Sequence, residues 1–140
     1  MTSGACLCGA VRFSAQMPAK WVAHCHCTRC QRAHGAAFVT WVGFSEASVA
    51  LSSDDDALRW YLTEAGARRG FCGRCGSPMF FQSPDYPGEC HIARAAFKTE
   101  LDQLPTENVF FSSRVHWAED VWTLPATPET RHPEGVQGDP

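Results

Sequence analysis

The stretch CGRCG at residues 72–76 and the stretch CLC at residues 6–8 contain four of the eight cysteines of the chain. In the first stretch the glycines relieve the steric cost of a tight turn, and that turn can aim backbone N–H groups at the two sulfurs. In the second stretch an extended backbone would point both cysteines to one face and the leucine to the other. Two pairs of thiolates supply the four ligands of a tetrahedral structural zinc site. We therefore expect Cys6, Cys8, Cys72 and Cys75 to bind one zinc ion.

A third stretch, CHCTRC at residues 25–30, holds three more of the eight cysteines. Disulfides between cysteines so close in sequence would close small, strained rings, so the spacing favours metal binding. Cys25 and Cys27 can share one face of an extended segment, and a turn can bring Cys30 beside them. Zinc with three protein ligands and an open fourth position is typical of a reactive site. The alternative is a closed site, whose fourth ligand would be Cys90, His24, His26, His34 or His91.

Length and composition indicate one globular domain of 140 residues, with 19% charged residues, a net charge of −3 and a pI near 6.0. This balance argues against a nucleic-acid binder, which needs clustered Lys and Arg. No apolar run approaches the roughly 20 residues that cross a bilayer, and the first residues lack the features of a signal peptide. We expect a cytoplasmic protein with a domain at residues 1–125 and a Pro- and Gly-rich tail at 126–140.

The rest of the chain predicts an all-β domain, because short apolar and β-branched runs alternate with turn residues. We expect most of the aromatic residues, Trp21 and Trp41 among them, in the core. Short helices are expected only at 28–34 and 100–104. The predicted strands cover residues 11–15, 21–24, 36–44, 49–51, 58–62, 68–71, 79–82, 91–94, 109–112 and 121–122.

Three stretches in this order, CLCGAVRF (6–13), CHCTRCQR (25–32) and RGFCGRCGSP (69–78), resemble the glutathione-dependent formaldehyde-activating enzyme family. The wider group includes centromere protein V. The resemblance runs from about residue 4 to 117. It implies a β-tent fold, a structural zinc on the cysteines at 6, 8, 72 and 75, and a second zinc on those at 25, 27 and 30. It also implies a reaction that joins glutathione and formaldehyde to S-hydroxymethylglutathione, formally a carbon–sulfur lyase acting in either direction.

The second zinc would favour a substrate thiol as its fourth ligand and hold the sulfur as a nucleophile for an aldehyde. For the acid that protonates the resulting alkoxide we hypothesise His26 or His34; the alternative for each is a solvated or structurally hydrogen-bonded histidine. Arg29 and Arg32 flank the cysteines and could bind the carboxylates of glutathione. Their alternative role is to offset the thiolate charge or to lie in solvent.

A second functional hypothesis is a non-catalytic zinc-stabilised module that binds a protein partner, or a thiol or metal sensor. The coordination of the second zinc separates these hypotheses. Three sulfurs and an exchangeable ligand favour chemistry, whereas a fourth protein ligand favours a module. The expected partners are a glutathione-like thiol and an aldehyde, without nucleic acid or membrane, and the oligomeric state stays open.

Overall fold

The computed structural model describes residues 1–127, which form two β-sheets, one short α-helix and three 3₁₀ turns. The expected tail, 126–140, lies outside the described residues apart from Ala126 and Thr127. The helical elements are α1 (Thr28–His34), η1 (Glu46–Ser48), η2 (Arg94–Ala96) and η3 (Phe111–Ser113). The strands are β1 (Thr2–Ala5), β2 (Val11–Ala15), β3 (Trp21–Cys25), β4 (Val39–Ser45), β5 (Val49–Ser53), β6 (Leu58–Leu62), β7 (Arg68–Cys72), β8 (Pro78–Gln82), β9 (Glu89–Ala93) and β10 (Glu107–Val109).

The all-β prediction is confirmed, and α1 has the bounds expected from the sequence. Three expectations are wrong. Residues 100–104 form no helix, residues 121–122 lie in turns, and the strand expected at 109–112 ends at Val109. The last difference has a local cause, because Phe110 adopts a left-handed conformation (φ 53°) and the chain then turns into η3. None of the helices among residues 1–127 is long and apolar enough to span a membrane.

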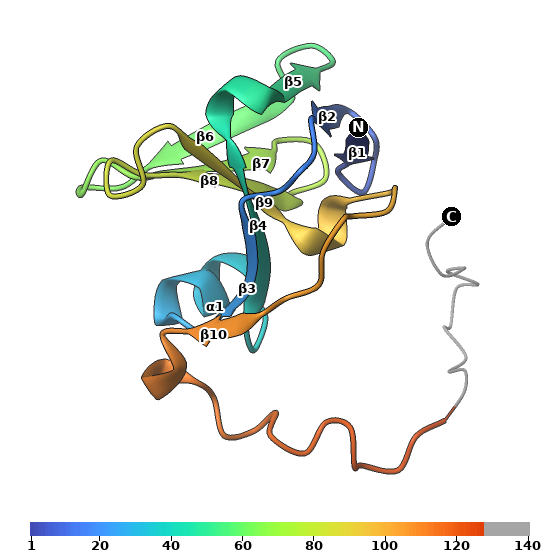
Figure 1. Ribbon diagram of the computed structural model, residues 1–140, viewed down its shortest axis with the longest axis vertical. Helices are drawn as coiled ribbons and strands as arrows, with labels where there is room; N and C mark the ends of the chain where they lie inside the picture. The colour runs from blue at the N-terminus through green and yellow to red at the C-terminus, as the bar shows by residue number, and fades with distance from the viewer. Residues whose placement is uncertain (128–140) are drawn as a thin grey trace.

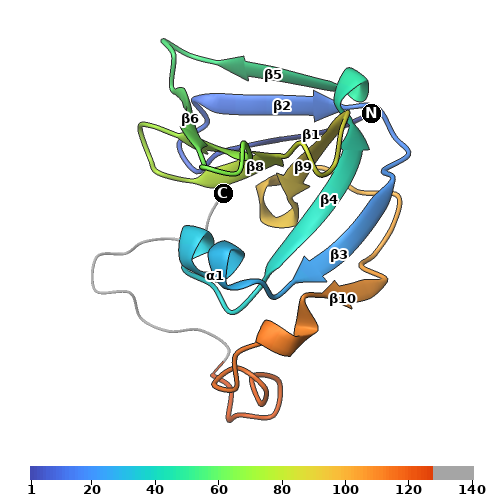
Figure 2. The same cartoon turned by 90° about the vertical axis from the view of Figure 1, so that its left-hand side faces the viewer.

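The two sheets differ in size and in connectivity. The small sheet has the order β1-β2-β5, and the large one has the order β10-β3-β4-β9-β8-β7-β6. All strand pairs are antiparallel except β10 and β3, which run parallel. Figure 1 shows β10 beside β3 with α1 next to them, and Figure 2 shows the small sheet lying over one end of the large one. Strand β1, which the sequence did not reveal, pairs with β2 along its whole length.

The core lies between the two sheets. One row of paired residues runs across the large sheet from Trp60 on β6 to Val22 on β3, through Gly70, Phe80, Ile92 and Val42. This row packs against the inward side chains of β2, including Phe13. The pattern follows from strand geometry, because directly paired residues point to the same face of a sheet.

The next row across the large sheet points to the opposite face, because successive residues of a strand alternate. Its members are, in order from β6 to β3, Tyr61, Arg69, Phe81, His91, Gly43 and Trp21. The same face carries Cys25, which lies four residues after Trp21 on β3. This face therefore brings charged, aromatic and thiol side chains together away from the core.

Candidate functional site

The first cysteine cluster joins the small sheet to the large one. Its four sulfurs, those of Cys6, Cys8, Cys72 and Cys75, all lie within 4.8 Å of one another. Cys6 and Cys8 do not lie on an extended strand as expected. They lie in the turn between β1 and β2, where the Gly9 amide donates to the Cys6 carbonyl at 3.0 Å. The turn, rather than the alternation of a strand, makes the two sulfurs converge.

The geometry of this cluster fits zinc. Zinc–sulfur bonds of about 2.3 Å place two sulfurs of a tetrahedral site about 3.8 Å apart. The Cys6 and Cys8 sulfurs lie 3.7 Å apart, and those of Cys8 and Cys72 lie 3.8 Å apart. Burial alone would raise the pKa of Cys75, but hydrogen bonds from the Ser77 hydroxyl and amide lower it to about 6. A thiolate favoured in this way is the form that binds a metal ion.

The second cluster lies where β3 leads into α1. The sulfurs of Cys25, Cys27 and Cys30 lie within 4.8 Å of one another, so this group too could hold a metal ion. Cys27 caps the helix, and its sulfur accepts a hydrogen bond of 3.2 Å from the Cys30 amide. Hydrogen bonds lower the pKa of Cys30 to about 4, the strongest from the Cys25 thiol and another from the Arg69 guanidinium, which lies 3.7 Å away.

Within residues 1–127, no histidine, carboxylate or further cysteine joins this group of three. Cys90, a possible fourth ligand by sequence, is buried in the core between the sheets, on the face of β9 opposite to His91. Burial raises the pKa of its thiol to about 12. The structure therefore presents three sulfurs here and four in the first cluster.

The segment after β10 encloses this second cluster. The His26 amide donates to the Val109 carbonyl at 3.0 Å, and the Gln31 side-chain amide donates to the carbonyls of His26 (2.7 Å) and Ser113 (2.9 Å). Phe110, with its left-handed backbone, lies between these attachments. A non-glycine residue in this conformation carries a free-energy cost that the surrounding contacts must offset. The segment is thereby fixed against the cluster.

A cavity of about 690 Å³ opens beside the three-cysteine cluster. The cluster itself, Arg29 and Arg69 form part of its lining. Five Trp, Tyr and Phe side chains also contribute, and these are Trp21, Trp41, Phe81, Tyr86 and Phe110. Trp41 is nearly fully buried, whereas Trp21 keeps partial exposure. The cavity thus combines apolar walls with cations and cysteine sulfurs, as small-molecule sites do.

The same lining includes a hydrogen-bonded pair of a histidine and a carboxylate. His91 Nε2 lies 2.9 Å from Glu89 Oε2, and Glu89 is paired in turn with Lys20 through its other oxygen. Burial lowers the pKa of His91, which outweighs the opposite effect of Glu89. From sequence alone His91 was only a candidate fourth ligand. The signal that identifies the pair is the spacing of two residues on a strand, which places Glu89 and His91 on one face.

Comparison with known proteins agrees with this arrangement. The family model for the glutathione-dependent formaldehyde-activating enzyme (GFA) matches residues 1–113. The chain belongs to the GFA family. A Halomonas elongata protein named "Putative glutathione-dependent formaldehyde-activating enzyme" is 27% identical over 135 residues, which cover 85% of this chain and 80% of that protein. A crystal structure of a Rhodobacter sphaeroides protein superposes with a TM-score of 0.60 at 22% identity, covering 74% of this chain and 97% of that one, and supports the fold.

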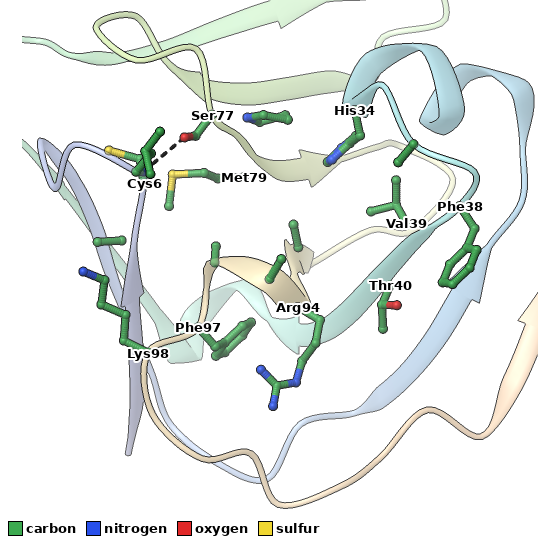
Figure 3. Close-up of a pocket in the computed structure, with 17 residues that line it drawn as sticks. Cys6, His34, Phe38, Val39, Thr40, Ser77, Met79, Arg94, Phe97 and Lys98 are labelled. Atoms are coloured by element: carbon green, nitrogen blue, oxygen red, sulfur yellow. Dashed lines mark hydrogen bonds between the residues drawn. The ribbon is translucent and has the colours of Figure 1, made fainter. Parts of the chain in front are cut away.

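The two histidines expected to act in this GFA-family protein do not line the cavity of the three-cysteine cluster. His26 is buried, its Nε2 lies 2.8 Å from Asn108 Oδ1, and its ring packs against Phe38 and Phe111. His34 lines a different cavity, of about 950 Å³, which Figure 3 shows between α1 and the turn that carries Cys6. Burial lowers the pKa of His34 to about 4.

The two arginines expected to bind substrate also separate. Arg29 lines the cavity of the three-cysteine cluster, whereas Arg32 is exposed and lines neither of the two cavities described here. Arg69, on β7, also lies beside the sulfurs, with its guanidinium 3.7 Å from Cys30 Sγ. The register explains this position, since Arg69 pairs with Phe81 on the cavity face of the large sheet.

Proposed function

We propose that the protein is a zinc-dependent carbon–sulfur lyase that forms or cleaves the adduct of a small thiol and an aldehyde. Glutathione or a related thiol is the sulfur partner, and formaldehyde or a related aldehyde is the carbon partner. The observation that carries the proposal is a group of three cysteine sulfurs on the wall of a cavity, without a fourth protein ligand among residues 1–127. Membership of the GFA family supports it.

Cys25, Cys27 and Cys30 would hold the second zinc, as the first cluster would hold a structural one. Zinc bound there would supply a fourth position that favours a soft sulfur ligand and lowers the pKa of a thiol. Three thiolates around a divalent ion leave a net negative charge, and Arg69 offsets it through its contact with Cys30. The cation thereby makes it easier to bring a further anionic sulfur to the cluster.

The remaining lining would bind and shield the reactants. Trp21, Trp41 and Phe81 supply apolar walls that exclude water from the reacting carbon. Arg29 lies at the edge of the cluster and is placed to pair with a substrate carboxylate, since Arg matches carboxylates in a bidentate manner. Arg32, which does not line this cavity, would contribute only a positive charge near the cysteines and would not bind the substrate. The proposal routes no proton through His26 or His34, because neither lines this cavity.

The proposal places the protein in the cytoplasm, since all eight cysteines are free and both clusters need reduced thiols. The reaction is balanced without an oxidant. The thiol S–H bond breaks, a C–S bond forms, and the proton reaches the former carbonyl oxygen.

The test compares zinc content with catalysis of adduct exchange. Because thiols add to aldehydes unaided, the rate of exchange between free glutathione and its formaldehyde adduct is measured by exchange NMR with and without zinc-loaded protein. Cys27→Ser should lower the content from about two zinc ions per chain to about one and remove the protein-dependent rate. Cys90→Ala, which removes a cysteine outside both clusters, should change neither.

Acceleration that survives in Cys27→Ser would contradict the proposal. Wild-type protein that binds glutathione but does not accelerate exchange would favour the alternative function of a thiol sensor or a non-catalytic module.

A further inference from the structure

A partly buried carboxylate and a buried histidine form part of the wall beside the three-cysteine cluster. Glu89 and His91 both line the cavity and lie two residues apart on β9, so their side chains leave the same face of the sheet. His91 is only 4% exposed, and its ring lies between those of Trp21, Phe81 and Tyr86. The histidine is thus fixed in position by packing as well as by its bond to Glu89.

The surroundings of Glu89 determine which nitrogen of His91 carries the proton. Lys20 donates to Glu89 Oε1, and Trp21 Nε1 donates to Oε2 at 3.2 Å. Burial alone would raise the pKa of Glu89, but the hydrogen bonds from Lys20, His91 and Trp21 lower it. An ionised carboxylate can only accept, so His91 Nε2 must carry a hydrogen. The neutral ring then has its lone pair on Nδ1.

The second ring nitrogen of His91, Nδ1, is available to a substrate. It has no hydrogen-bond partner within the part of the chain that the structure describes, while Nε2 is held by Glu89. Two residues further along β9, Ala93 packs with Cys25 and Cys30. Two residues of a strand span about 6.6 Å. His91 and the three cysteines line the same cavity, so a thiol that occupies the open side of the cluster shares that cavity with the histidine.

We propose that His91 Nδ1 is the base that takes the proton of the substrate thiol, and that Glu89 is the positioning residue that keeps His91 in the tautomer this requires. The inference rests on the proposed function, since it assigns the proton acceptor of that reaction. The S–H bond breaks and an Nδ1–H bond forms. As the sulfur adds to the carbonyl carbon, the C=O π electrons pass to oxygen, which takes the proton back from Nδ1. Glu89 stabilises the intervening imidazolium, as the carboxylate of a catalytic triad does.

The test counts protons instead of turnovers. Glutathione binding to the zinc-loaded protein is measured at pH 7 by calorimetry in buffers of different ionisation enthalpy, which gives the number of protons released per thiol bound. The bound thiolate adds a negative charge to the cavity that His91 lines, and this charge raises the pKa of the ring above its value in the free protein. His91 then keeps the proton, and the wild-type protein releases nearly none. In His91→Gln the proton has no acceptor, and about one should reach the buffer. The titratable groups around His91 are Lys20, Cys30, Tyr86 and Glu89, and all of them remain in this variant.

A second variant leaves the ring in place. In Glu89→Gln the negative charge beside the ring is lost, so the buried imidazolium is no longer stabilised and His91 cannot keep the proton. This variant should also release about one proton, whereas His116→Gln, a change at an exposed histidine, should match wild type. The fold of each variant is checked by its near-UV circular dichroism and zinc content.

Equal proton release by wild type, His91→Gln and Glu89→Gln would overturn the inference, and so would a failure of the wild-type protein to bind glutathione. Proton retention by wild type without faster adduct exchange would instead sustain the inference about His91 and reject the lyase function.

Discussion

Replacing Gly43 with alanine should destabilise the protein, because the indole ring of Trp21 occupies the space that a Cβ would need. An added Cβ would lie 2.2 Å from Trp21 Cε2 and 2.4 Å from its Nε1. Favourable contacts between carbon atoms begin at about 3.5 Å, so the ring would have to move by about 1.3 Å. The ring is not free to do so. Its Nε1 donates to Glu89 at 3.2 Å, and it packs edge-on against His91 with 4.6 Å between the ring centres.

The expected loss of stability combines three effects. Overpacking a close-packed site costs about 1–3 kcal/mol. Losing the hydrogen bond from Trp21 to the ionised Glu89 costs about 1.5–3 kcal/mol. The lower entropy of the unfolded alanine chain offsets about 0.4–1 kcal/mol. We therefore expect the free energy of unfolding to fall by about 2–6 kcal/mol.

Urea unfolding of the zinc-loaded protein, followed by circular dichroism, measures this change. The matched control is the same substitution in a Trp21→Leu background, where the indole atoms that a Cβ would meet are absent. There Gly43→Ala should cost less than about 1 kcal/mol, and the difference between the two backgrounds gives the coupling of the pair. An equal cost in both backgrounds would refute the argument, because the clash would then lie elsewhere.

Three further outcomes are expected. Cys72→Ser should leave the chain unfolded or aggregated, since a structural zinc contributes about 10–16 kcal/mol against a domain stability of about 5–15 kcal/mol. Circular dichroism should show that the control variant Cys27→Ser is folded. A folded Cys72→Ser would contradict the assignment of Cys72 as a structural zinc ligand. Cys90→Ala should keep the wild-type zinc content and lose about 1 kcal/mol of stability, and a lost zinc ion would make Cys90 a ligand. His34→Asn should remove part of the acid sensitivity. Between pH 6.5 and about 4 the unfolded chain binds a proton at His34 that the folded protein does not bind. As the pH is lowered through this range, the wild-type protein should therefore lose about 1.4 kcal/mol of stability per pH unit more than the variant loses. Parallel pH dependences of urea unfolding would contradict this.

The strands that carry strong local patterns could be predicted from the sequence. Val11, Phe13 and Ala15 alternate with polar residues, and β2 has the bounds expected for them. β1 could not be predicted in this way, because its sequence TSGA has no apolar alternation and its strand is defined by pairing with β2. The strand expected at 109–112 failed for the opposite reason. Phe110 and Phe111 favour a strand locally, but the left-handed backbone at Phe110 ends it.

In the candidate site too, some features could be predicted from the sequence and others could not. The spacing of the cysteines was enough to separate them into groups of four and three, and the structure brings together the same groups. The cavity lining depends on long-range register, which spacing within one motif does not contain. Trp21, expected in the core, lines the cavity with His91 because both pair with Gly43. His26, although it stands between two of the cysteines, packs instead against the segment after β10.

Strand β7 serves both cysteine clusters, and an irregularity in its pairing explains how. Arg69 pairs with Phe81 on the cavity face, where it contacts Cys30. Between Gly70 and Phe71 the register with β8 shifts, so that Phe71 pairs with Pro78 and Met79 is left over as an extra residue. Such a bulge bends the strand that carries the extra residue, here β8, and increases the local twist of the pair. The end of β7 carries Cys72 of the four-cysteine cluster, while its beginning lies beside the three-cysteine cluster. Both clusters then depend on one strand, so removing the extra residue would displace either the Cys72 sulfur or the Arg69 guanidinium from its cluster.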